Sequence, residues 1–176
     1  GDVYKRQVFN EWTLQRLPKD FKKDQQMNKR LTIAIQKNGR LSAQSKNLIN
    51  KSGISFNSKA DKLLAKSSNL PVDILFVRDD DIPSLVSNGD ADLAIVGENV
   101  LIEKTLFKKK NIIKSLDLGF SKCRLSIAAP ENSRFKSLRN KKIATSYPNV
   151  LKKYLKDNSI EATVINIHGS VELTPY

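Results

Sequence analysis

From Leu31 onward, short apolar runs alternate with helix-like segments, and this alternation restricts the fold more than any other feature of the sequence. Apolar runs of four to seven residues, bounded by polar or glycine-containing stretches, are typical of buried strands. The predicted strands are residues 31–35, 72–77, 93–96, 112–118, 124–129, 142–145 and 162–167. Strands that alternate with helices through short links predict an α/β fold with largely parallel sheets.

Glycine and proline mark the ends of the predicted helices. Gly53 is placed to end the first helix, because glycine readily adopts the left-handed conformation found after a helix C-terminus. Pro83 lies just inside the start of the next helix, which Gly89 closes, and Pro148 starts a later one. These signals support the same alternating order.

The net charge is +13, from 31 Lys and Arg against 18 Asp and Glu. A positive charge of this size is also found in proteins that bind nucleic acid, so nucleic acid has to be considered as a partner. The lysines are scattered, however, and residues 108–110 are interpreted as a solvated loop, so an ordinary basic surface is favoured and no nucleic-acid partner is expected.

Two further features of the sequence bear on where in the cell the protein is located. No run of about 18 apolar residues occurs, so no membrane association is expected. The single cysteine, Cys123, is unable to form an internal disulfide and is interpreted as a buried apolar residue. The predicted location is the cytoplasm.

Residues 1–26 differ from the rest of the chain. They show no sustained period of two or 3.6, and the only methionine, Met27, follows them. The interpretation is a non-native leader before a protein that starts at Met27. A genuine N-terminal extension is the alternative.

In open α/β sheets, ligands bind beyond the carboxyl ends of the strands. The loop after the first predicted strand combines a glycine, two cations and a helix N-terminus, which together favour an anion. Its residues are Gln36, Lys37, Asn38, Gly39 and Arg40. From the residues alone, a phosphate site and a plain turn are both open.

After the second predicted strand comes Arg78, followed by Asp79, Asp80 and Asp81. One interpretation is a helix whose start is capped by Asp81 and favoured by acids. The other is that Arg78 binds phosphate as a planar fork, while a carboxylate binds ribose hydroxyls or the shell of a Mg²⁺ ion.

Later strand ends carry weaker candidates, and a helix cap is an alternative explanation for Ser146 and for Ser170. His168 is interpreted as structural. The other candidates at these positions are Gly97, Glu98, Asn99, Tyr147 and Glu172.

Taken in order, five motifs resemble the catalytic portion of the ATP phosphoribosyltransferase family. The resemblance runs from about Met27 to Tyr176. The motifs are IAIQKNGRLS (33–42), DILFVRDDDIPSLVSNGDADLAIVGENVL (73–101), LGFSKCRLSIAAP (118–130), KKIATSYPNVLKKYL (141–155) and GSVELTP (169–175).

The resemblance implies transfer of the phosphoribosyl group of phosphoribosyl pyrophosphate to N1 of ATP, with Mg²⁺, as the first step of histidine biosynthesis. It implies a periplasmic-binding-protein-like (type II) pair of α/β domains, at 27–122 and, incompletely, at 123–176. The cleft between them would be lined by the residues at 36–40, by Arg78 with Asp79 beside it, and by residues 97–99 on one side. Tyr147 and Glu172 would approach from the other side. The group that removes the adenine proton is left unassigned, with Glu172 as a candidate.

The resemblance also implies a long-form enzyme that assembles into dimers and hexamers. The sequence departs from the family pattern in ending at Tyr176, before the loop expected to bind the 5′-phosphate of the donor. The expectation is therefore a fragment that is inactive alone. The main alternative is a small-solute-binding module of the same architecture, because fold does not determine function.

Overall fold

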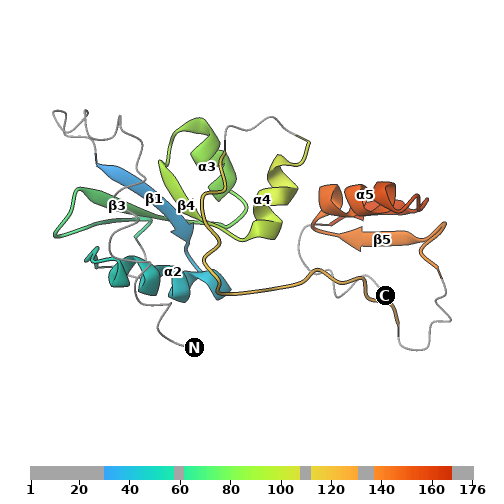
Figure 1. The fold of residues 1–176 in the computed structure, drawn as a ribbon, viewed down its shortest axis with the longest axis horizontal. Coiled ribbons are helices and arrows are strands. Elements are labelled where there is room, and N and C mark those ends of the chain that lie inside the picture. The colour runs from blue at the N-terminus through green and yellow to red at the C-terminus, as the bar shows by residue number, and fades with distance from the viewer. Residues whose placement is uncertain (1–29, 58–61, 108–111, 131–136, 168–176) are drawn as a thin grey trace. The chain divides into compact units, whose positions relative to one another are not determined.

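The computed structural model describes residues 30–57, 62–107, 112–130 and 137–167 (Figure 1). The predicted leader, the lysine loop at 108–110, His168 and Glu172 lie outside the described residues. No helix in the described ranges is both long enough and apolar enough to cross a membrane.

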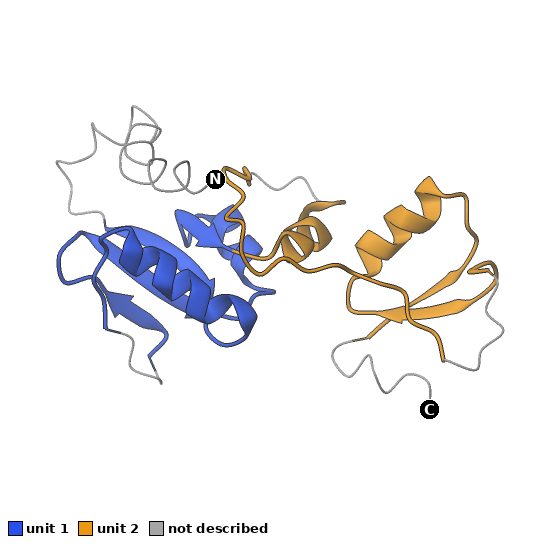
Figure 2. Ribbon diagram, turned by 60° about the horizontal axis from the view of Figure 1, so that its bottom comes forward, with its two compact units in different colours: residues 1–95 blue, residues 96–176 orange. Residues whose placement is uncertain are grey.

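The chain divides into two compact units, residues 1–95 and 96–176 (Figure 2). Unit 1 contains β1 (Leu31–Gln36), α2 (Arg40–Lys51), β2 (Leu64–Lys66), β3 (Val72–Val77), α3 (Ile82–Asn88) and β4 (Leu93–Ile95). Unit 2 contains α4 (Glu98–Thr105), β5 (Lys142–Thr145), α5 (Pro148–Asp157) and β6 (Thr163–Asn166). The α/β prediction is confirmed, while the domain boundary at 122 stays a prediction.

Unit 1 is built on a four-stranded sheet with the order β2-β3-β1-β4. β1 pairs in parallel with β3 on one side and with β4 on the other, as the alternating pattern predicts. β2 was not predicted. It pairs antiparallel to β3 at the sheet edge, where Ala65 lies opposite Ile74. Three residues are too few to show a period of two, so the sequence carries no signal for this strand.

Helices cover both faces of this sheet. Side chains alternate along a strand, so Ile33 and Ile35 of β1 point to the same face as Ile74 of β3. These residues form the core with Ile49 of α2. Ala34, fully buried between the two isoleucines, points to the opposite face, where α3 contacts β1 and β4. Figure 1 shows α2 below the strands and α3 above them.

Unit 2 has a much smaller core. β5 and β6 pair in parallel, joined by α5, whose side chains Leu151 and Leu155 are buried. Among the described residues, unit 1 holds ten of the thirteen buried apolar side chains. Unit 2 holds the remaining three, which are Leu151, Leu155 and Val100 of α4.

Three predictions, two strands and the burial of the cysteine, were wrong. Residues 112–118 and 124–129 form no strand, because no described segment pairs with them, and a strand exists only where a neighbour takes its N–H and C=O groups. Most of their apolar side chains are exposed, for example Ile113 at 87%, while Ile112 and Leu118 are partly buried. Cys123, expected to be buried, is also exposed.

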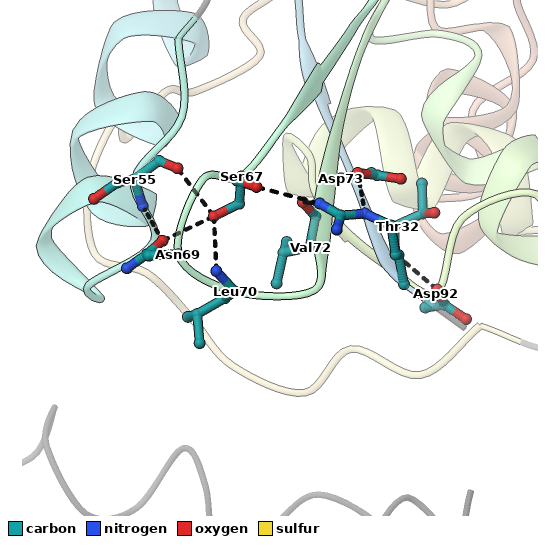
Figure 3. A network of polar contacts seen from close by, with 9 residues as sticks. Thr32, Ser55, Ser67, Asn69, Leu70, Val72, Asp73 and Asp92 are labelled. Atoms are coloured by element: carbon teal, nitrogen blue, oxygen red, sulfur yellow. Dashed lines mark hydrogen bonds and ion pairs between the residues drawn. The ribbon is translucent and has the colours of Figure 1, made fainter. Parts of the chain in front are cut away.

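A polar network holds the end of the unit 1 sheet where β1 and β3 begin (Figure 3). Arg30 Nε donates to Asp73 Oδ1 at 2.7 Å, which ties the chain before β1 to β3. Ser67, after β2, donates its hydroxyl to Ser55 O at 2.9 Å, and Asn69 Oδ1 accepts from Ser55 N at 2.9 Å. These bonds fix the β2–β3 turn at the sheet end opposite the carboxyl termini of β1 and β3, so we conclude that they stabilise the fold.

Replacing Ser45 by alanine is expected to raise the free energy of unfolding by about 1 kcal/mol, because it removes a buried unpaired hydroxyl and adds a better helix former. Ser45 of α2 is fully buried, and its Oγ has no hydrogen-bond partner in the described part of the chain. Urea unfolding measures the change. Ser42→Ala is the matched control, because Ser42 Oγ donates to Lys37 O at 2.7 Å. Its loss should lower the free energy of unfolding, and equal destabilisation by both variants would contradict the assignment.

Candidate functional site

The strand order of unit 1 creates a crevice between β1 and β3. β1 leads into α2 on one face of the sheet, and β3 leads into α3 on the other face. The segments that follow these two neighbouring strands therefore diverge. Such divergence is where open α/β sheets bind ligands. An open pocket of about 380 Å³ lies at this position. It is lined by Gln36, Lys37, Asn38, Leu63, Phe76, Val77, Arg78, Asp79 and Asp80.

Main-chain and side-chain bonds hold the loop after β1 in place. Lys37 N–H donates to Val77 O at 2.8 Å, which extends the pairing of the two strands by one residue. Lys37 O in turn accepts from Ser42 Oγ of α2 at 2.7 Å. Gln36 Oε1 accepts from Leu41 N at 3.3 Å at the start of the same helix. The loop is therefore fixed against both β3 and α2.

Gly39 has a local reason to be glycine. Its φ is +109° and its ψ is −171°, a combination that side chains with a Cβ rarely adopt. A Cβ at this position would also lie 2.8 Å from Gln36 Nε2. The glycine is thus explained by the turn and by Gln36, without the close approach of a ligand.

Two of the three cations expected on one wall lie together. Lys37 and Arg78 leave neighbouring strand ends and line the same pocket. Arg40, the first residue of α2, is exposed and does not line it. The pocket therefore combines two positive side chains with the carboxylates of Asp79 and Asp80.

The helix-cap explanation for the three aspartates is not what the structure shows. Asp81 occupies the N-cap position of α3, but its side chain makes no capping hydrogen bond. Asp79 Oδ1 instead accepts from Asp80 N at 3.1 Å, and Asp81 N donates to Arg78 O at 3.1 Å. These bonds form a tight turn that places Asp79 and Asp80 at the pocket.

Sequence reasoning missed the apolar wall of the pocket. Phe76 is only 3% exposed; its ring centroid lies 6.3 Å from that of Phe56, and Lys46 Nζ lies 5.2 Å from the centroid of the Phe76 ring. Leu63, which precedes the unpredicted β2, is 58% exposed. Phe76 was available as the next-to-last residue of a predicted strand, whereas Leu63 carried no signal.

A second group of predicted site residues lies in unit 2. Asn99, in the first turn of α4, donates from Nδ2 to Tyr147 Oη at 2.8 Å. Tyr147 occupies the N-cap position of α5, so the structure brings these two predicted residues together. Gly97 occupies the N-cap position of α4 in an extended conformation.

Glu98, at the start of α4, is engaged with the segment after that helix. Lys114 Nζ lies 2.6 Å from Glu98 Oε1 and 2.7 Å from Asp117 Oδ1. The hydrogen bond to Asp117, and then that to Glu98, raises the pKa of Lys114 above its usual value. All three side chains are exposed, so this cluster is a surface ion pair of small energetic weight.

The described residues contain no group of three or more His, Cys, Asp or Glu that could hold a metal ion by themselves. Asp79 and Asp80 are the carboxylates at the pocket, and Mg²⁺ is commonly held by one or two carboxylates together with substrate phosphates. The pocket therefore suits a Mg²⁺ ion that arrives with a phosphorylated ligand.

Comparison with known proteins finds a matching family and many similar proteins, among them one sequence relative and one solved structure. The sequence profile of the ATP phosphoribosyltransferase family matches residues 78–176, more than half of the chain. An ATP phosphoribosyltransferase of Cytophaga hutchinsonii is 49% identical over 82% of this chain and 50% of its own length. The chain thus spans about half the length of this curated relative. The solved ATP phosphoribosyl transferase (HisG:HisZ) complex from Thermotoga maritima superposes with a TM-score of 0.63 at 27% identity, covering 82% of this chain and 68% of that one.

Proposed function

Because the chain belongs to the ATP phosphoribosyltransferase family, we propose that the protein to which these residues belong transfers phosphoribosyl from phosphoribosyl pyrophosphate to N1 of ATP. Pyrophosphate leaves, and the product opens histidine biosynthesis. The matched relatives are named as transferases, so the small-solute-binding alternative is not favoured.

The pocket between β1 and β3 is the observation that supports the proposal most directly. Both substrates carry several phosphate charges, and Lys37 and Arg78 present two cations from adjacent strand ends. Arg78 offers a planar fork that suits a phosphate, while Lys37 acts as a point charge on a fixed loop. The exposed Leu63, beside the buried Phe76, supplies apolar lining against which a base or ribose can pack. Mixed cationic and apolar lining of this kind fits a nucleotide.

The proposed chemistry depends on position and charge. Pyrophosphate leaves a ribose that becomes oxocarbenium-like, and fixed cations lower the energy of the separating charges. Mg²⁺ bound to the substrate phosphates would neutralise part of this charge, with Asp79 or Asp80 holding its shell. Lys37 and Arg78 then bind and orient the phosphates.

Other parts of the proposal extend the site. Further substrate-binding residues are proposed at two places: Gly39 and Arg40 in the loop after β1, and Gly97, Glu98, Asn99 and Tyr147 in unit 2. Glu172, outside the described residues, is proposed to approach the substrates. A type II two-domain core, a homo-oligomer and a cytoplasmic location also belong to the proposal. The solved relative is itself a complex, which supports assembly.

The test is a titration of the chain with ATP, with and without Mg²⁺, followed by two-dimensional amide NMR. We expect the unit 1 shift changes to concentrate at residues 36–38 and 76–80, because these residues line the pocket. Free amino acids and sugars serve as controls, since a solute-binding module would respond to one of them and ignore ATP. No shift change at millimolar ATP would contradict the proposal.

A further inference from the structure

Glu103 of α4 is a buried acid to which the sequence analysis gave no role. It is 6% exposed, and its carboxylate faces the start of α5. Asn149 N donates to both carboxylate oxygens at 3.0 Å, and Val150 N donates to Oε2 at 2.9 Å. Asn149 Nδ2 also donates to the main-chain oxygen of Glu103 at 3.0 Å. Glu103 thus binds the first turn of α5 through both its side chain and its backbone.

These bonds satisfy groups that a helix leaves open. The first N–H groups of an α-helix have no partner within the helix, and its N-terminus favours negative charge. At α5 the N-cap residue, Tyr147, makes no side-chain capping bond. Glu103 therefore caps α5 from a different helix. A buried carboxylate is costly unless hydrogen bonds compensate, and here the α5 amides supply them.

The same face of α4 carries Asn99. Residues four apart lie one turn from each other on one side of a helix, so Asn99 and Glu103 both point toward α5. In one turn of α4, Asn99 donates a hydrogen bond to the Tyr147 hydroxyl. In the next turn, Glu103 accepts hydrogen bonds from the amides of Asn149 and Val150. The two contacts act on residues only two or three apart in the chain. Together they fix both the position and the direction of the turn that carries Tyr147.

We propose that Glu103 is a positioning residue that keeps the Tyr147 hydroxyl in contact with Asn99. It acts through the α5 amides and touches no substrate. Its importance for nucleotide binding rests on the proposed function, which places Asn99 and Tyr147 among the substrate-binding residues. Its effect on the Asn99–Tyr147 contact does not depend on that function.

The substitution Glu103→Gln tests the proposal at nearly constant size. It removes the negative charge and turns an NH₂ group toward N–H donors, so the α5 amides lose one acceptor. We expect amide hydrogen exchange at Asn149 and Val150 to accelerate about tenfold, a typical effect of losing a cap. The Asn99 side-chain amide signal should also move toward its unbonded position. Glu161→Gln, the same change at an exposed acid of unit 2, should alter neither signal.

The outcomes separate a positioning role from a purely structural one. If the α5 amides change while the Asn99 signal does not, Glu103 only caps a helix and the proposal is overturned. If Glu103→Gln does not fold, Glu103→Asp, which keeps the charge but retracts it, should give smaller shifts of the same signals. An unchanged Asn99 signal in that folded variant would also overturn the proposal.

A second measurement links the contact to binding. ATP affinity should fall about tenfold in Glu103→Gln and remain unchanged in Glu161→Gln, because a misplaced Tyr147 loses one substrate hydrogen bond. Should the parent chain bind no ATP at all, the proposed function fails, while the Asn99 signal still decides the positioning role. Unchanged ATP affinity alongside a displaced Asn99 signal would remove Tyr147 and Asn99 from the site, and with them the functional part of the proposal.

Discussion

Replacing Arg78 by methionine is expected to weaken ATP binding by about ten- to a hundredfold, since a hydrogen-bonded charge is worth about 1.5–3 kcal/mol. Arg78 is exposed at the pocket between β1 and β3, and methionine keeps much of its apolar length. The free energy of unfolding should therefore change little. Isothermal titration with ATP and urea unfolding of the same samples measure the two quantities.

Two variants make this prediction specific. Arg139→Met removes the same charge from an exposed position in unit 2 and should leave ATP affinity unchanged apart from a small loss of the general positive field. Arg78→Lys keeps the charge but loses the planar fork, so its affinity should fall between those of the parent and the methionine variant. Equal losses in Arg78→Met and Arg139→Met would show that ATP responds only to net charge, and the pocket would lose its assigned role.

Replacing Gly39 by alanine is expected to lower the free energy of unfolding by roughly 1–3 kcal/mol, chiefly because its backbone conformation is strained for a residue with a Cβ, with a smaller cost for moving the end of the Gln36 side chain. The φ of +109° disfavours any Cβ, and the added carbon would meet Gln36 Nε2 at 2.8 Å. Gln36 would have to move, although its Oε1 accepts from Leu41 N. Urea unfolding gives the stability, and ATP titration shows whether the pocket loop has moved with Gln36.

Gly53 provides the matched control for this substitution. Its φ is +83°, and a Cβ there would meet no atom within 4 Å. Gly53→Ala should therefore cost only the backbone term, about 1–2 kcal/mol. The difference between the two variants measures the collision with Gln36. If both variants lose the same stability and bind ATP equally well, Gln36 does not hold the loop.

The fold could be predicted where a strand is marked by its own residues. β3 and β5 were found with their observed bounds, because each has apolar and β-branched residues at its centre and is bounded by turn-forming or polar residues. The failure at residues 112–130 has a different cause. Their apolar pattern suits a strand, but a strand also needs a neighbour, and pairing is a property of the tertiary structure. The three-residue β2 shows the reverse case, since pairing with β3 makes a strand that its own residues do not indicate.

The same distinction applies to the site. The strand-end rule located the loops of Lys37 and Arg78 before any contact was known, because parallel strands bring their carboxyl ends to one edge. Arg40 lies three residues beyond Lys37, on the first turn of α2, and does not line this pocket, so its role in binding stays a prediction. Glu103 was missed because an acid within a helix usually faces solvent, and only the packing of α5 against α4 makes it a buried acceptor.

The unequal distribution of buried side chains has a consequence for how this protein responds to heat. The described part of unit 1 has ten buried apolar residues and that of unit 2 has three, so the small β5–α5–β6 layer should lose its amide protection at a lower temperature than the four-stranded sheet. A calorimetric scan would then show two transitions, and a single melting temperature would describe only the larger one. Damage at Tyr147 or Glu103 would be visible in the first transition and nearly silent in the second.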